Sequence, residues 1–178
     1  MTLPSVTQII SPWQDFSQIP EDVLQAACDR GRAVHGLCAA RAKKLFIPPV
    51  HEDYRGYYES FVRWFDYAVV EVVAVERELI EKQLRYKGHP DLIARLRGDH
   101  CLTVIDYKTP ITHKLAWCLQ CAGYRRLGLG NDYDIGRNLS LRLRPDGSRA
   151  LITEYSSNYA HDLAVFLNAK AVWEYFNS

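Results

Sequence analysis

The stretch "LTVIDYK", residues 102–108, decides the fold. Its β-branched and aromatic residues favour a strand, and Pro110 ends that strand. Because side chains alternate between the two faces of a strand, Asp106 and Lys108 lie on the same face at its end. The carboxylate can hold a hard cation, and the ammonium group beside it can bind a phosphate or a water molecule.

Two strand candidates precede this segment in the chain. Residues 72–80 are β-branched and strand-like, and residues 84–97 form a second candidate that Gly88 and Pro90 interrupt. A turn at Gly98 separates this candidate from the central strand. We therefore expect the three strands to follow one another as a meander with short turns.

A meander brings acidic side chains from successive strands together. We expect Glu76, Asp91 and Asp106 to converge beside Lys108. Three carboxylates raise one another's pKa unless a cation neutralises them, so the cluster favours a divalent ion. Such an ion polarises a phosphate and lowers the pKa of a bound water, which suits phosphodiester hydrolysis. The alternative is a solvated, purely structural Asp-x-Lys pair.

Helices and a hairpin account for the rest of the chain. In the first helix we expect Val23, Val34 and Cys38 to lie close to one face, and the glycine pair Gly128 and Gly130 closes the third helix. The aromatic stripe of the second helix, at helical spacing, is expected in the core. The predicted helices cover residues 20–45, 51–68, 114–127 and 159–176, and the predicted hairpin pairs residues 138–144 with 149–155.

Length and charge restrict the class of protein. A chain of 178 residues suits one domain, here with N-terminal helices in 1–70, catalytic strands and a helix in 71–128, and a hairpin and last helix in 134–178. The 22 basic and 21 acidic residues give a net charge of +1, which excludes a polycation but not a local basic groove.

Targeting and redox signals point to the cytoplasm. No apolar run approaches the roughly 20 residues of a membrane helix, and the first residues do not resemble a signal peptide. The five cysteines are scattered, so we expect free thiols in a reducing compartment. Cys118 and Cys121 have the spacing of a metal pair, but no second pair accompanies them, and helix packing is the favoured interpretation.

The run from residue 76 to residue 124 resembles the PD-(D/E)XK nuclease superfamily, in the branch with RecB-type and phage-type exonucleases. The matching elements are Glu76, "GHPDLIA" around Asp91, "VIDYKT" with Asp106 and Lys108, and "QCAGY" at 120–124. Upstream, "RGRAVH" resembles a G-x-x-x-H element, and "LPSVTQII" is similar to the N-terminal segment of small phage and mitochondrial exonucleases.

The resemblance implies a restriction-endonuclease-like α/β (α+β) core, with a central mixed β-sheet of about five strands flanked by helices. It implies that Asp91, Asp106 and the carbonyl of Tyr107 ligate Mg²⁺ or Mn²⁺, one or two ions. Lys108 is implied to activate water or stabilise negative charge, and Glu76 to bind a second metal or orient water.

The resemblance also assigns roles to the helix after the central strand. Gln120 and Tyr124 lie at i and i+4 on one helical face, which in the family points at the active site. Gln120 would position the nucleophilic water, and Tyr124, with Arg125 and Arg126, would contact the DNA backbone. The alternative is a core-facing polar pair of Gln120 and Tyr124.

Two site residues remain open. His35 is implied as a metal ligand, but Arg32 and Ala39 stand where the family usually has a hydroxyl residue and an acid. A buried, hydrogen-bonded histidine is the competing interpretation. Glu78 competes with Glu76, because both residues face the same side of the strand.

Two other cofactors are not expected. No G-x-x-x-x-G-K-[ST] loop is present, so no nucleotide-driven motor is expected. No cysteine follows Cys121, which argues against the iron–sulfur cluster that some family members carry.

The expected partner is DNA, single- or double-stranded, bound without sequence specificity in a groove of basic side chains. The candidates are Arg41, Lys43, Lys44, Arg95, Arg97, Arg125, Arg126, Arg137, Arg142, Arg144 and Arg149. No membrane partner is expected, and a homo-oligomer or a single-strand annealing partner remains open.

The expected function is a metal-dependent DNA exonuclease of phage or prophage recombination or replication. The alternatives are an endonuclease of the same fold and a catalytically silent DNA- or partner-binding domain. Polarity and strand preference stay open.

Overall fold

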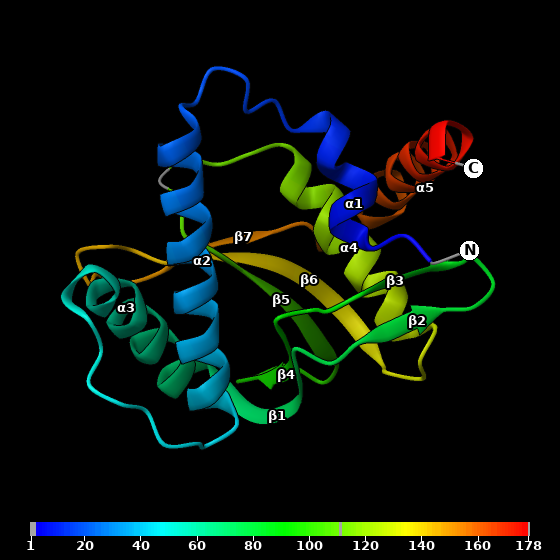
Figure 1. The fold of residues 1–178 in the computed structure, drawn as a ribbon. Helices are drawn as coiled ribbons and strands as arrows, with labels where there is room; N and C mark the ends of the chain where they lie inside the picture. Colours follow the sequence, from blue (N-terminus) through cyan, green and yellow to red (C-terminus); the bar gives the residue numbers. More distant parts are fainter. Residues whose placement is uncertain (1–2, 111, 178) are drawn as a thin grey trace.

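A central five-stranded sheet organises the molecule in the computed structural model, which describes residues 3–110 and 112–177. Its strands follow the order β1-β4-β5-β6-β7 (Figure 1). Their bounds are β1 (Val69–Val75), β4 (Leu92–Leu96), β5 (Leu102–Lys108), β6 (Ile135–Arg142) and β7 (Leu151–Glu154). A separate two-stranded ladder pairs β2 (Leu79–Glu81) with β3 (Tyr86–Gly88).

The central sheet is mixed. β1 pairs antiparallel with β4, and β4 pairs antiparallel with β5, as the expected meander requires. β5 then pairs in parallel with β6 after a helical crossover, and β6 pairs antiparallel with β7. The predicted α+β class with a mixed sheet of five strands is confirmed, and the meander orders the three strands that carry the acidic residues.

The meander differs from the prediction in one respect. The segment 72–80, expected as one strand, is divided between β1 and β2, and the segment 84–97 is divided between β3 and β4. Glu76 adopts a left-handed backbone conformation with φ of 48°, which ends β1 and turns the chain away from the sheet. A β2–β3 hairpin is therefore inserted between β1 and β4.

Helices cover both faces of the sheet (Figure 1). Side chains of α2 and α3 pack with Leu92, Ile105 and Leu141 on one face. Side chains of α1, α4 and α5 pack with Ile93 and Val104 on the other face. The bounds are α1 (Val6–Ile10), α2 (Glu21–Ala42), α3 (Glu52–Ala68), α4 (Ala116–Leu129) and α5 (Tyr159–Asn177), with short 3-10 turns η1 (Ser11–Trp13) and η2 (Ser156–Asn158).

The first predicted helix is buried only along its C-terminal half. Val34 and Cys38 are buried as expected, but Val23 is exposed. The reason is visible in Figure 1, where the N-terminal turns of α2 extend past the edge of the sheet. The aromatic stripe of α3 does lie in the core, with Tyr57 and Phe61 buried.

The glycine pair Gly128 and Gly130 marks the end of α4 as predicted, although Gly128 itself still lies within the helix. The helix continues to Leu129, and Gly130 is its C-terminal cap. A Cβ atom at Gly128 would lie 2.0 Å from Cδ1 of Ile135, so this glycine permits close packing of α4 against β6. Among the described helices, none is long and apolar enough to cross a membrane.

Two glycines test the packing of the helical layer. A Cβ atom at Gly56 on α3 would lie 1.7 Å from the carbonyl oxygen of Pro145, whereas a Cβ atom at Gly36 on α2 meets nothing within 4 Å. We expect Gly56→Ala to lower the free energy of unfolding by about 1–3 kcal/mol. Gly36→Ala should raise it by about 0.5–1 kcal/mol, because alanine favours the helix. Urea unfolding measures both changes, and equal effects would contradict this packing.

Candidate active site

Two of the predicted acidic residues, Asp91 and Asp106, lie where β4 begins and β5 ends. Leu92 of β4 is paired with Ile105 of β5 in an antiparallel register. The next positions along this register are Asp91 and Asp106, so the two carboxyl-bearing residues lie opposite each other. Both side chains are buried. The site is therefore built on the rigid centre of the sheet.

Asp91 connects three elements through its carboxylate. Oδ1 lies 3.0 Å from Nδ1 of His35, which α2 presents to the sheet end. Oδ2 accepts a hydrogen bond of 2.5 Å from the backbone N–H of Tyr107 on β5. Both oxygens of this buried carboxylate thus have a partner, as burial of a charged group requires.

Lys108 connects the strand to helix α4. Its Nζ lies 2.5 Å from Oδ2 of Asp106 and donates a hydrogen bond of 2.7 Å to Oε1 of Gln120. Nε2 of Gln120 donates in turn to the hydroxyl of Tyr124, at 3.3 Å. The ammonium group also lies 5.5 Å from the centre of the Trp117 ring, within cation–π range. The predicted Asp106, Lys108, Gln120 and Tyr124 thus form one continuous polar chain.

Charge and burial act together on the titratable groups. Burial raises the pKa of Asp106, Lys108 lowers it, and the charge of Asp91 raises it further, so the net shift is upward. For His35, burial alone would lower the pKa, but the charges of Asp91 and Asp106 and the hydrogen bond to Asp91 outweigh it and raise the pKa. The site is a desolvated carboxylate pair partly compensated by a lysine and a histidine.

Glu76 lies beside Asp91, and Glu78 is engaged elsewhere. The backbone N–H of Glu76 donates to the carbonyl of Asp91 at 3.2 Å, while the Glu76 side chain is exposed. Oε2 of Glu78 lies 2.9 Å from Nζ of Lys87 and 3.4 Å from Nε2 of His89. The backbone of Glu76 thus lies at Asp91, whereas Glu78 pairs with Lys87, and a role of the Glu76 carboxylate in the site stays a prediction.

A cleft of about 390 Å³ opens beside this cluster. His35, Lys108 and Gln120 line it, together with residues that sequence reasoning did not single out. Trp117 precedes Gln120 by one helical turn, so its spacing could have placed it on the same face of α4. Tyr107, which the sequence singled out as a candidate ligand, also lines the cleft, whereas the spacing gives no such signal for Thr7, Ser11, Gln14, Thr109 and Pro110.

The donors fit a divalent cation in charge and in kind. Asp91 and Asp106 offer carboxylate oxygens, which Mg²⁺ and Mn²⁺ prefer, and a cation would offset the burial that raises the pKa of Asp106. His35 offers an imidazole at the same place. In residues 3–110 and 112–177, no group of three or more His, Cys, Asp or Glu side chains is placed to hold a metal ion. Ligation by the Tyr107 carbonyl stays a prediction.

The residues predicted to contact DNA make contacts within the fold. Tyr124 is 5% exposed. Arg125 donates to Oδ1 of Asn138 and stacks on the ring of Tyr159, 4.1 Å from its centre. Nε of Arg126 lies 3.5 Å from Oε2 of Glu81. Contact of these side chains with DNA stays a prediction.

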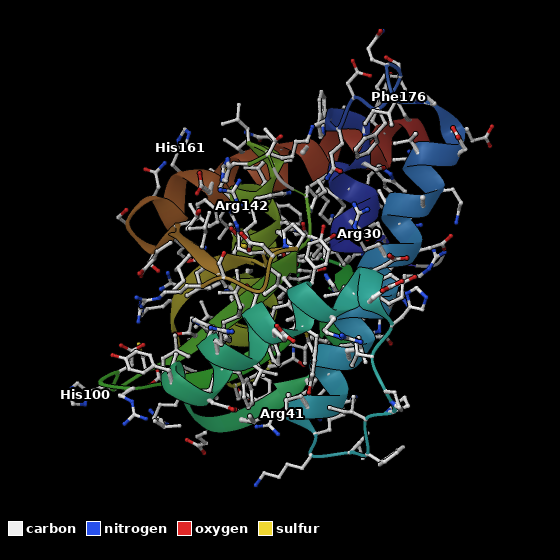
Figure 2. The ribbon with its side chains drawn as sticks, turned by 90° about the vertical axis from the view of Figure 1, so that its left-hand side faces the viewer. Arg30, Arg41, His100, Arg142, His161 and Phe176 are labelled. Carbon is white, nitrogen blue, oxygen red and sulfur yellow. The ribbon has the colours of Figure 1, made fainter. Side chains whose placement is uncertain are left out.

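Some of the wider set of basic residues are paired with acids within the fold. Arg41 pairs with Asp66, and Arg137 pairs with both Asp99 and Glu154. Figure 2 shows Arg41 at the C-terminal end of α2, several helical turns away from Arg30. Two members of the predicted basic groove therefore make ion pairs within the fold, and contact of the groove with DNA stays a prediction.

Cys118 and Cys121 are free thiols on α4. Burial raises the pKa of the Cys121 thiol well above its usual value, and this residue packs with Trp117 and Tyr155. Burial also raises the pKa of Cys118, to about 11. These positions agree with helix packing, the interpretation that the sequence favoured.

Comparison with known proteins gives no further assignment. No protein-family model matches the chain, and none of the curated proteins matches it significantly.

The bond between Asp91 and the backbone of Tyr107 gives a stability test. Asp91→Ala leaves a buried N–H without an acceptor and should lower the free energy of unfolding by about 1–3 kcal/mol. Asp91→Asn removes the same charge but keeps an acceptor oxygen, so its loss should be clearly smaller. Urea unfolding compares the two variants, and equal stabilities would show that the carboxylate does not hold β5.

Proposed function

We propose that the protein is a metal-dependent deoxyribonuclease that hydrolyses phosphodiester bonds. The single observation that carries the proposal is the position of Lys108, whose ammonium group contacts both Asp106 and Gln120 at the cleft. Asp91 lies opposite Asp106 on the neighbouring strand. A lysine that lines a cleft and contacts a buried carboxylate, with a second buried carboxylate on the neighbouring strand, is a set suited to a charged phosphoryl centre.

Each side chain has a role in this proposal. Asp91 and Asp106 hold Mg²⁺ or Mn²⁺, with His35 and Glu76 as further candidate ligands. The chemistry that such a cation supplies when bound is neutralisation of phosphate charge and a lower pKa of a coordinated water. Lys108 donates hydrogen bonds to the charge that develops on the phosphate oxygens, and Gln120 fixes the direction of the Lys108 ammonium group.

The arrangement of the strands supports the same class of protein. Two antiparallel steps followed by a parallel one, with α4 as the crossover, agree with the restriction-endonuclease-like core that the sequence resemblance implies. We therefore propose membership of the PD-(D/E)XK superfamily and action on DNA in phage or prophage recombination or replication, in the cytoplasm. Whether the protein forms a homo-oligomer or binds a single-strand annealing partner stays open.

Cleavage of end-labelled DNA tests the function. With Mg²⁺ or Mn²⁺ the wild type should degrade the DNA, and EDTA should stop the reaction. Asp106→Asn and Lys108→Met should each lower the rate at least about 100-fold, since general acid–base and electrostatic contributions are of this order or larger. A wild type that leaves all DNA intact with either metal would overturn the proposal.

A matched pair of acids serves as the control. Glu76→Gln should reduce the cleavage rate, because Glu76 lies beside Asp91. Glu78→Gln removes the same charge two residues away but only breaks contacts with Lys87 and His89. Its rate should stay within about twofold of the wild type, as surface ion pairs contribute little.

Two alternatives are separated in the same assay. Cutting of closed circular DNA would favour an endonuclease, whereas strict dependence on a free end favours the exonuclease that we propose. DNA binding without cleavage would favour a silent binding domain.

A further inference from the structure

A second hollow adjoins the candidate active site. It measures about 120 Å³ and is lined by Trp13, Phe16, Lys114 and Leu115, among others. Gln14 lines both this hollow and the cleft with Lys108 and Gln120. The two spaces therefore share a wall, and a ligand that leaves the cleft past Gln14 meets the aromatic pair.

The large apolar side chains that line this second hollow are exposed to solvent rather than packed in the core. Trp13 is 54% exposed and Phe16 is 37% exposed, and both follow the well-buried helix α1 in the chain. Leu115, on the opposite wall, is 86% exposed. By contrast, Trp64 and Trp117 are almost fully buried. Large exposed apolar side chains gathered at one place mark an interaction surface.

The hollow combines exposed aromatic rings with the ammonium group of Lys114. Lys114 is exposed, and no ion pair involves it within the described part of the chain. Asp15 also lines the hollow, but its carboxylate accepts a hydrogen bond from the backbone N–H of Ser17 within its own turn. Aromatic faces beside a free ammonium group are what single-stranded nucleic acids bind, through base stacking and phosphate contact.

We propose that Trp13 and Phe16 form a stacking platform for the unpaired bases of a single DNA strand that enters the cleft. This inference rests on the proposed nuclease function and gives it a substrate class, because bases within an intact duplex are already stacked on one another. Lys114 would hold a phosphate of the same strand. The platform therefore selects a single strand or a frayed end over a closed duplex.

Fluorescence titration in EDTA tests the platform without cleavage. The probe is a thymidine oligonucleotide, compared with a blunt hairpin duplex of the same length. The oligonucleotide should quench tryptophan emission in the wild type, because Trp13 is exposed at the hollow, Trp64 and Trp117 are buried, and the half-buried Trp173 lines neither space. Trp13→Phe should keep the affinity but remove most of the quenching.

Affinity measured by anisotropy completes the test. Trp13→Ala and Phe16→Ala should each weaken oligonucleotide binding about fivefold or more, which corresponds to the lower limit of one stacked base. Phe46→Ala is the matched control, since Phe46 is also exposed but does not line either space. Urea unfolding of the variants establishes that each remains folded.

The outcomes separate this inference from the proposed function. If Trp13→Ala and Phe16→Ala bind the oligonucleotide as the wild type does, or if the duplex binds and quenches equally well, the platform is wrong even when DNA is cleaved. If binding depends on Trp13 and Phe16 but no metal supports cleavage, the platform stands and the nuclease proposal fails.

Discussion

The site depends on the carboxylate of Asp91, which connects helix α2 to strand β5. One oxygen contacts His35 on α2, and the other accepts the backbone N–H of Tyr107 on β5. Through these two contacts, one side chain fixes the position of a helix and the end of the central strand. Asp106 and Lys108 flank Tyr107 in the sequence, so the same bond also fixes where their side chains begin. Because His35 and Tyr107 both line the cleft, loss of their contacts with Asp91 would disturb the shape of the cleft.

Burial of the site has an energetic cost, because it disfavours the charged form of Asp106. Placing Asp106 away from water raises its pKa, and the structure compensates with Lys108 and His35 at the cost of two more partly buried charges. Such an arrangement contributes little to stability, so it indicates function more than architecture. Gln120 and Trp117 then limit the freedom of the Lys108 ammonium group from the side of α4.

Sequence patterns predicted the parts of the fold that rest on periodicity. β5, α3 and α5 appear close to where alternation or helical spacing placed them, and the register of β4 with β5 brings Asp91 to Asp106 as the meander requires. Two other features could not be predicted. The turn at Glu76 depends on a left-handed backbone conformation that residues other than glycine rarely adopt. Helix α1 is short; a capping box of Ser5 and Gln8 begins it, and distant elements bury its apolar residues. The cleft lining was missed for the same reason, because it joins residues far apart in the chain.

Asp91 and Asp106 are proposed to bind a divalent cation together, and a Mn²⁺ binding measurement is the sharpest test of this site. Electron paramagnetic resonance of Mn²⁺ titrated with the protein at neutral pH reports the bound fraction without any substrate. The account predicts saturable binding to the wild type that Asp91→Asn and Asp106→Asn each abolish, while Glu78→Gln leaves it unchanged. Absence of binding to the wild type, or binding that survives both aspartate substitutions in folded protein, would contradict it.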